Sequence, residues 1–158
     1  MSPRAACRLE TLGFAAVYDY VAGKQEWLAY GLPTEGERSA VLTPADIARK
    51  DVVTCGLGDR IGHVRENVRR SEYGFALVIS ATGVLLGRLQ RPALEGDADA
   101  TAERTMEAGP STVRPDADLA ALVERLLKRD LRYAIVTTPD GALVGVLRRV
   151  DAEAHLAS

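Results

Sequence analysis

The chain has 158 residues, of which 47% are hydrophobic and 27% are charged, and its formal net charge at pH 7 is −2. This is the composition of a globular protein with enough apolar residues for a core, and the lack of a basic excess argues against nucleic acid as the default partner. No apolar run approaches the roughly 20 residues of a membrane-spanning helix, no signal peptide is visible, and the two cysteines are far apart, so we expect a cytoplasmic protein without membrane contact or a metal site.

The first expected element is a helix over residues 2–12. Ser2 is a good N-cap, Pro3 suits the first helical position, and Gly13 can end the helix. Three further elements follow in chain order, namely a short strand, a helix that contains the lone tryptophan, and a linker, at 15–20, 24–30 and 34–39.

The strongest signal is an internal repeat at an offset of 58 residues, which carries Thr54 onto Thr112 without gaps. Each copy predicts an extended segment, a helix, a hairpin of two strands and a closing helix. About 50 residues of this kind bury their own apolar surface poorly, so we expect the copies to pack sheet against sheet. The offset preserves the glycines of both hairpins, Gly83 with Gly141 and Gly87 with Gly145.

In the second copy, either Asp116 or Asp118 can cap the start of the helix, and a tight turn joins the two strands. The expected elements of that copy are an extended segment at 111–113, a helix at 119–127, strands at 133–137 and 142–147, and a closing helix from Arg149. The first copy predicts an extended segment at 52–54, strands at 75–79 and 84–89, and a closing helix from Arg91.

This arrangement resembles the CBS domain, named after cystathionine β-synthase, in which a hairpin ends with Gly-h-h-(Thr/Ser)-x-x-Asp, where h is apolar. Residues 145–151 read Gly-Val-Leu-Arg-Arg-Val-Asp, and residues 87–93 read Gly-Arg-Leu-Gln-Arg-Pro-Ala. The resemblance implies an α/β fold of the α+β type: a tandem CBS-domain pair with pseudo-two-fold symmetry, with a first repeat at 42–100 and a second at 101–158.

CBS pairs often bind adenosine nucleotides in clefts between their repeats. The resemblance therefore implies a site for AMP, ATP or S-adenosylmethionine near Asp151, whose carboxylate would accept hydrogen bonds from two ribose hydroxyls. No cofactor is required. The first copy has Ala93 in place of this aspartate, so we expect at most one site of this type. The residues assigned to it are Thr112 as a cleft hydroxyl, Tyr133 and Ala134 near the base, Arg148 and Arg149 near the phosphate, and Asp151.

Two features weigh on this interpretation. Arg148 stands where the family has Thr or Ser, so a small hydroxyl contact is lost and bulk is added. Asp151 also fits a second interpretation, in which it only caps or ion-pairs the last helix, because an acidic residue is favourable near a helix N-terminus.

Residues 2–33 resemble the C-terminal end of a rhodanese-like domain, through Gly13-Phe14, Trp27 and Gly31-Leu32-Pro33. In that family the catalytic cysteine lies in a loop that would precede Met1 here, whereas Cys7 lies within the expected helix. We therefore assign residues 1–36 to a rhodanese-like remnant with its linker, either complete as it stands or the end of a longer domain, and expect no sulfur transfer.

The leading hypothesis for function is a non-catalytic regulatory module that forms a homodimer through the helices of its repeats. One alternative is a structural or protein-interaction module without a ligand, and another is the C-terminal part of a rhodanese-like sulfurtransferase. Nucleic-acid binding would rest on four arginines that a solvated surface explains better: Arg65, Arg69, Arg70 and Arg88.

Overall fold

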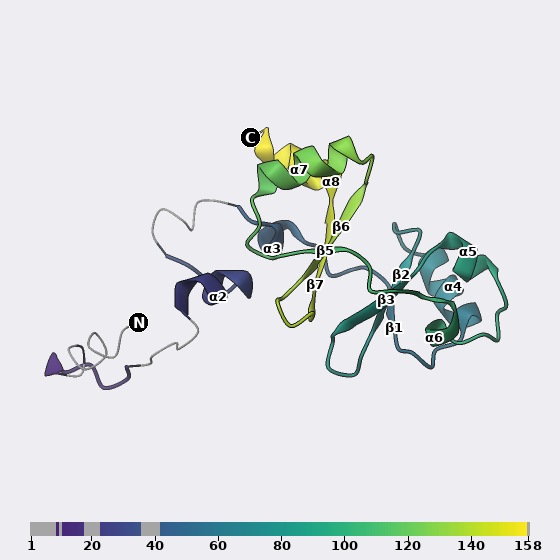
Figure 1. Cartoon of the computed structure of the whole chain (residues 1–158), viewed down its shortest axis with the longest axis horizontal. Helices are drawn as coiled ribbons and strands as arrows, with labels where there is room; N and C mark the ends of the chain where they lie inside the picture. The colour runs from purple at the N-terminus through teal and green to yellow at the C-terminus, as the bar shows by residue number, and fades with distance from the viewer. Residues whose placement is uncertain (1–8, 10, 18–22, 36–41, 158) are drawn as a thin grey trace.

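The computed structural model describes residues 9, 11–17, 23–35 and 42–157, and its main body consists of two similar halves of mixed α and β structure (Figure 1). The first half contains α3 (Pro44–Ile47), β1 (Thr54–Cys55), α4 (Ile61–Arg69), β2 (Ala76–Ile79), β3 (Leu85–Leu89) and α5 (Arg91–Glu95). The second contains α6 (Ala102–Thr105), β4 (Glu107–Ala108), β5 (Thr112–Val113), α7 (Leu119–Lys128), β6 (Tyr133–Thr137), β7 (Leu143–Arg148) and α8 (Arg149–Leu156). A further helix, α2 (Gly23–Ala29), precedes them.

The two halves repeat one sheet topology. β1 pairs in parallel with β2, which pairs antiparallel with β3, and β5, β6 and β7 are related in the same way. Even the register irregularity recurs, between Val78 and Ile79 in one sheet and between Val136 and Thr137 in the other. These positions are 58 residues apart, so the predicted internal repeat is confirmed in the backbone.

Each half also completes the sheet of the other. β4, which opens the second repeat, pairs with β3 of the first, with Glu107 opposite Arg88. Reciprocally, Arg49 at the start of the first repeat pairs with Val146 of β7, through two backbone hydrogen bonds of 2.9 Å. Arg49 and Glu107 are equivalent at the offset of 58, so the two repeats exchange their leading segments symmetrically.

The exchanged segments explain the two later glycines of the repeat. A Cβ on Gly145 would lie 2.6 Å from the backbone oxygen of Arg49. A Cβ on Gly87 would collide with Sδ of Met106 and lie 3.0 Å from the backbone oxygen of Glu107. A side chain at either position would press on the exchanged segment, against the backbone of Arg49 at Gly145 and mainly against the side chain of Met106 at Gly87.

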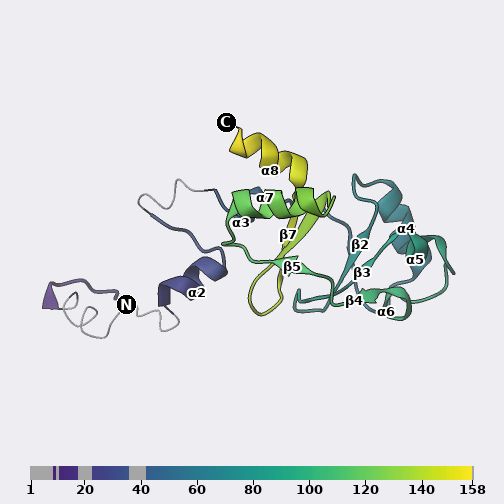
Figure 2. The same cartoon turned by 45° about the horizontal axis from the view of Figure 1, so that its top comes forward.

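The apolar residues form three clusters. One lies between α7, α8 and the second sheet, and one between α4, α5 and the first sheet. The third joins the two sheets, with Val52, Tyr73 and Leu77 of the first repeat packed against Ile135 and Val146 of the second. The sheets therefore meet in the middle and the helices lie outside, as the turned view in Figure 2 shows.

Most expected elements are confirmed within one or two residues. Of the two candidate caps for α7, Asp118 accepts a hydrogen bond of 2.7 Å from the amide of Ala121, whereas Asp116 pairs with Arg114. The short α3, α6 and β4 were not predicted, because four residues or fewer show no periodicity.

The N-terminal part is only partly described. The helix expected at 24–30 is confirmed as α2, and the turn after it brings Gly31 against Ala45 and Pro115. Of the strand expected at 15–20, residues 15–17 have no strand structure and the others lie outside the described residues, as does most of the expected helix at 2–12 and of the linker at 34–39. Cys7 also lies outside them.

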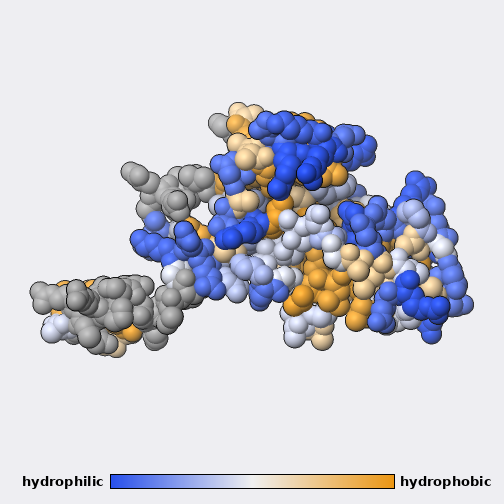
Figure 3. Space-filling view, viewed as in Figure 1, coloured by the Kyte–Doolittle hydropathy of each residue, from blue (hydrophilic) through white to orange (hydrophobic). Residues whose placement is uncertain are grey.

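None of the helices in the described ranges is long and apolar enough to span a membrane. The surface is unevenly coloured in Figure 3, where hydrophobic residues gather over the β2–β3 hairpin and hydrophilic residues cover α7. Part of this hairpin pairs with its counterpart, since the amide of Leu85 donates to the oxygen of Gly141 and the amide of Leu143 to that of Gly83.

Candidate ligand site

Asp151 lies in the first turn of α8, and α8 begins directly after the last residue of β7. Val146 of β7 pairs with Ile135 of β6 on one side and with Arg49 on the other. Asp151 is within 3.9 Å of Arg49, so its carboxylate lies on the side of β7 that faces the first repeat. The sequence thus places the retained carboxylate at the junction between repeats.

The carboxylate of Asp151 is held by Arg148. Nε of Arg148 donates to Oδ2 at 2.8 Å and Nη2 donates to Oδ1 at 2.7 Å, which is a two-pronged ion pair. The third guanidinium nitrogen, Nη1, donates to Oε2 of Glu72 at 2.7 Å. Glu72 belongs to the first repeat, so Arg148 bridges the two halves.

Further charged groups of the first repeat surround this pair. Nη2 of Arg49 lies 3.1 Å from Asp51, and its Nη1 lies 3.5 Å from Glu72. The hydroxyl of Tyr73 donates to Oδ1 of Asp51 at 2.8 Å. We refer to the whole set as the Asp151 cluster, which consists of Arg49, Asp51, Glu72, Tyr73, Arg148 and Asp151.

Contacts within the cluster shift the pKa of Asp151, Arg148 and Tyr73. The hydrogen bonds from Arg148 hold the pKa of Asp151 below its usual range, against the opposing effect of desolvation. The same hydrogen bonds raise the pKa of the Arg148 guanidinium. Burial, followed by the hydrogen bond to Asp51, raises the pKa of Tyr73 to about 12. With a neutral tyrosine, two arginines and three carboxylates, the cluster carries one formal negative charge in excess.

Of the residues assigned to the site from the sequence, the structure brings Arg148 and Asp151 together. Tyr133 is adjacent to them, because it pairs with Arg148 across β6 and β7. Its ring lies 5.6 Å from that of Tyr73 and 5.5 Å from that of Phe75. The aromatic residues therefore border the cluster on the side of the third apolar cluster.

The other three assigned residues lie elsewhere. Thr112 is in β5, which β6 separates from β7. Ala134 is buried in the apolar cluster beneath α7 and α8. Arg149 donates to the oxygen of Leu131 at 3.2 Å and lies 3.5 Å from Glu153, because the next residue of a helix points about 100° away from the last.

Four members of the cluster were not foreseen, namely Arg49, Asp51, Glu72 and Tyr73. They lie about 80 to 100 residues before Asp151, and charge complementarity at such separations leaves no periodic pattern. Extending the repeat upstream would have drawn attention to Arg49. It is equivalent to Glu107, which forms an ion pair with Arg88 in the first sheet.

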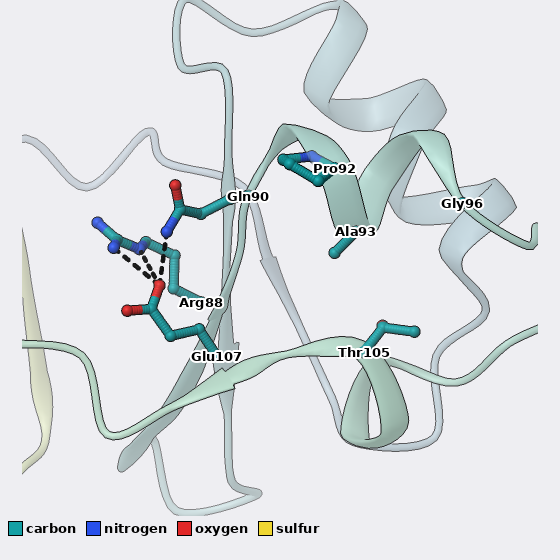
Figure 4. A pocket seen from close by; sticks show the side chains of 7 residues that line it. All are labelled: Arg88, Gln90, Pro92, Ala93, Gly96, Thr105 and Glu107. Atoms are coloured by element: carbon teal, nitrogen blue, oxygen red, sulfur yellow. Dashed lines mark hydrogen bonds and ion pairs between the residues drawn. The ribbon is translucent and has the colours of Figure 1, made fainter.

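The equivalent position of the first repeat is hollow. A cavity of about 470 Å³ is bordered there by Ala93, which replaces the aspartate, and by Gln90, which replaces Arg148 (Figure 4). Arg88 and Gln90 both donate to Oε2 of Glu107, at 2.9 and 2.6 Å. Without a carboxylate at position 93, this cavity lacks the equivalent of the contact proposed for Asp151.

A second hollow of about 430 Å³ lies between the start of the first repeat and the start of β7. It is lined by Lys50 and Val52, which flank Asp51, and by three residues of β7, Leu143, Val144 and Gly145. A cleft lined by one charged residue, here Lys50, and otherwise mainly by apolar residues suits a nucleobase with its sugar. Within the described ranges, no three or more His, Cys, Asp and Glu side chains are grouped to hold a metal ion.

Most of the arginines considered for nucleic acid are engaged within the protein. Arg65 donates to the backbone oxygens of Leu94 and Gly96, which ties α4 to the segment after α5. Arg69 pairs with Glu66 at 2.9 Å, and Arg88 pairs with Glu107 in the first sheet. These contacts give the arginines a structural role.

Comparison with known proteins identifies the fold. The sequence model of the CBS domain matches residues 102–157. Three solved structures align with TM-scores of 0.64, 0.64 and 0.63: the CBS domains of a transcriptional regulator from Streptococcus pneumoniae, the cytosolic domain of the Mg²⁺ channel MgtE in complex with ATP, and CBSX2 in complex with AMP. Their identities are 19%, 21% and 18%, and they cover 72%, 72% and 73% of this chain and 98%, 48% and 96% of their own.

Among curated proteins the sequence finds no match. None of these findings supports the resemblance of residues 2–33 to a rhodanese-like domain, which stays a prediction. Residues 102–157 match the CBS domain, and the two repeats have the fold of a tandem CBS-domain pair.

Proposed function

We propose that this CBS-domain pair is a non-catalytic, cytoplasmic regulatory module that binds an adenosine nucleotide beside Asp151. The observation that carries the proposal is the position of this carboxylate at the junction of the repeats, 3.9 Å from Arg49 of the first repeat. Two proteins with this fold have been solved with ATP and with AMP, which supports the ligand class.

In the proposed complex, the ribose diol donates to the two oxygens of Asp151. The base enters the hollow beside Val52, and the phosphate lies near the guanidinium groups of Arg49 and Arg148. The ligand contacts expected for Thr112, Ala134 and Arg149 stay predictions: Thr112 is on β5, Ala134 is buried in the apolar cluster of α7 and α8, and Arg149 donates to Leu131. The first repeat contributes no second site of this type, since Ala93 cannot accept a hydrogen bond through its side chain.

The test is a titration of the full chain with AMP, ATP and S-adenosylmethionine, followed by calorimetry and by the melting temperature. A ligand at about 100 times its Kd should stabilise the protein by about 2.7 kcal/mol. Asp151→Ala should abolish this gain, whereas the control Glu153→Ala, on the same helix and paired with Arg149 instead, should keep it. If none of the three ligands shifts the melting temperature, the nucleotide proposal fails.

A second candidate function is a protein-interaction module without a ligand. It is favoured by the two-pronged contact of Arg148, which already satisfies both oxygens of Asp151. In that case the Asp151 cluster would hold the repeats together permanently. Asp151→Ala would then lower the melting temperature of the protein alone, and the nucleotides would have no effect on either form.

We further propose that the chain forms a homodimer through helices of the second repeat. Three large apolar side chains on the helices of this repeat are about half exposed: Leu127 at the end of α7, and Val150 and Leu156 of α8. Exposed apolar residues that gather on one surface can mark a protein–protein interface. The equivalent of Leu127 in the first repeat is Arg69. Sedimentation should give a dimer, and Leu127→Arg, which copies the first repeat, should give a monomer.

A further inference from the structure

We propose that Arg148 is an internal competitor for the ligand, which must leave Asp151 before the ribose can bind. This inference rests on the proposed function, because it assigns a specificity-determining residue to the same site. It derives from the difference between Arg148, with its long cationic side chain, and Gln90, the neutral residue at the equivalent position of the first repeat.

The competition follows from the geometry of the pair. The planar guanidinium of Arg148 lies in front of the carboxylate, with one nitrogen 2.8 Å from Oδ2 and another 2.7 Å from Oδ1. A ribose diol that donates one hydroxyl to each oxygen needs the same space. Because the two arrangements exclude each other, the ligand binds only the fraction of molecules in which the pair is open.

The guanidinium has another acceptor when the pair opens. Nη1 of Arg148 already donates to Glu72 at 2.7 Å, and Glu72 is mostly exposed and able to follow it. Arg49 lies 3.9 Å from Asp151 and 3.5 Å from Glu72, so the carboxylate also keeps a positive neighbour. Opening therefore exchanges partners within the cluster and leaves no charge unpaired.

Arg148 should also determine which ligands bind. A phosphate gives the displaced guanidinium a strong new partner, whereas neutral adenosine offers it none. The apparent Kd equals the intrinsic Kd divided by the open fraction, so a pair that is closed in about nine of ten molecules weakens binding about tenfold. The protein should therefore prefer AMP to adenosine by more than its intrinsic affinities alone require.

The experiment is calorimetric titration of the full chain with adenosine and with AMP, using wild type, Arg148→Thr and Arg148→Lys. Arg148→Thr should bind adenosine about tenfold more tightly than wild type, and the preference for AMP should fall. Arg148→Lys keeps the charge but cannot make the two-pronged contact, so its affinity for adenosine should be intermediate. The control Gln90→Thr makes the same change at the equivalent position of the first repeat and should bind as wild type does.

Near-ultraviolet circular dichroism of each variant checks that it is folded, and Arg148→Lys carries the test if Arg148→Thr is not. If the folded variants bind AMP and adenosine with wild-type affinities, the competitor role is refuted while the nucleotide site stands. If neither wild type nor any variant binds either compound, the proposed function fails and the inference fails with it.

Discussion

Gly145→Ala tests the close contact on which the exchange of segments depends. The new Cβ would lie 2.6 Å from the backbone oxygen of Arg49 and 3.2 Å from Cβ of Ala48, so the exchanged segment must retreat by about 1 Å to reach ordinary contact. Overpacking of this kind costs about 1–3 kcal/mol, and we expect the upper end because the colliding atom is in the backbone. Retreat would also weaken the two hydrogen bonds between Arg49 and Val146.

The assay is urea unfolding followed by circular dichroism, in which we expect a loss of about 3 kcal/mol and a melting temperature lower by about 6–12 °C. Gly87→Ala is the matched control, because it mainly meets the flexible end of Met106, and it should lose at least about 1 kcal/mol less. Gly83→Ala isolates backbone strain, since its φ is +81° and its Cβ would meet nothing within 4 Å. A Gly145→Ala protein as stable as Gly87→Ala would refute the reasoning.

Three further outcomes are expected. Asp118→Ala removes the N-cap of α7 and should lower the free energy of unfolding by about 1 kcal/mol in urea titration, whereas an unchanged value would mean that the cap is replaced by water. Burial, followed by the hydrogen bond to Asp51, raises the folded pKa of Tyr73 to about 12, above its unfolded value, so its stabilisation is fully present below pH 10 and is lost as the pH rises towards 12. Tyr73→Phe should flatten this part of a stability profile, and an identical profile would contradict the raised pKa of Tyr73. Burial raises the pKa of Cys55 to about 11, so in a Cys7→Ser background Ellman's reagent at pH 8 should label it only after unfolding, and rapid labelling of the folded protein would contradict its burial.

The repeat made most of the fold predictable. Hydrophobic spacing predicted α7 from Leu119 onward, and the turn residues up to Gly141 predicted the second hairpin. The φ of Gly141 is +84°, as such a turn requires. The offset then transferred both to the first copy. What the pattern lacked was any reason for Gly87 and Gly145, because a steric requirement between segments about 20 to 100 residues apart is visible only in three dimensions.

The candidate site was predictable only in part. The family resemblance directed attention to Asp151 and Arg148, which lie together, whereas its assignment of Thr112, two strands away on β5, to the same cleft stays a prediction. The cleft was expected between the repeats, but every residue assigned to it from the sequence belongs to the second copy. In the structure, Arg49 and Glu72 cross from the first repeat, so the second site is completed by the other half.

The reciprocal pairing of Arg49 with β7 and of Glu107 with β3 has a consequence for truncated forms of the protein. A fragment that begins at residue 101 would keep β4 but lose β3, and its own sheet would lose the β-bridge between Arg49 and Val146. We therefore expect deletion of one half to destabilise the other, because each half loses the partner of its exchanged segment.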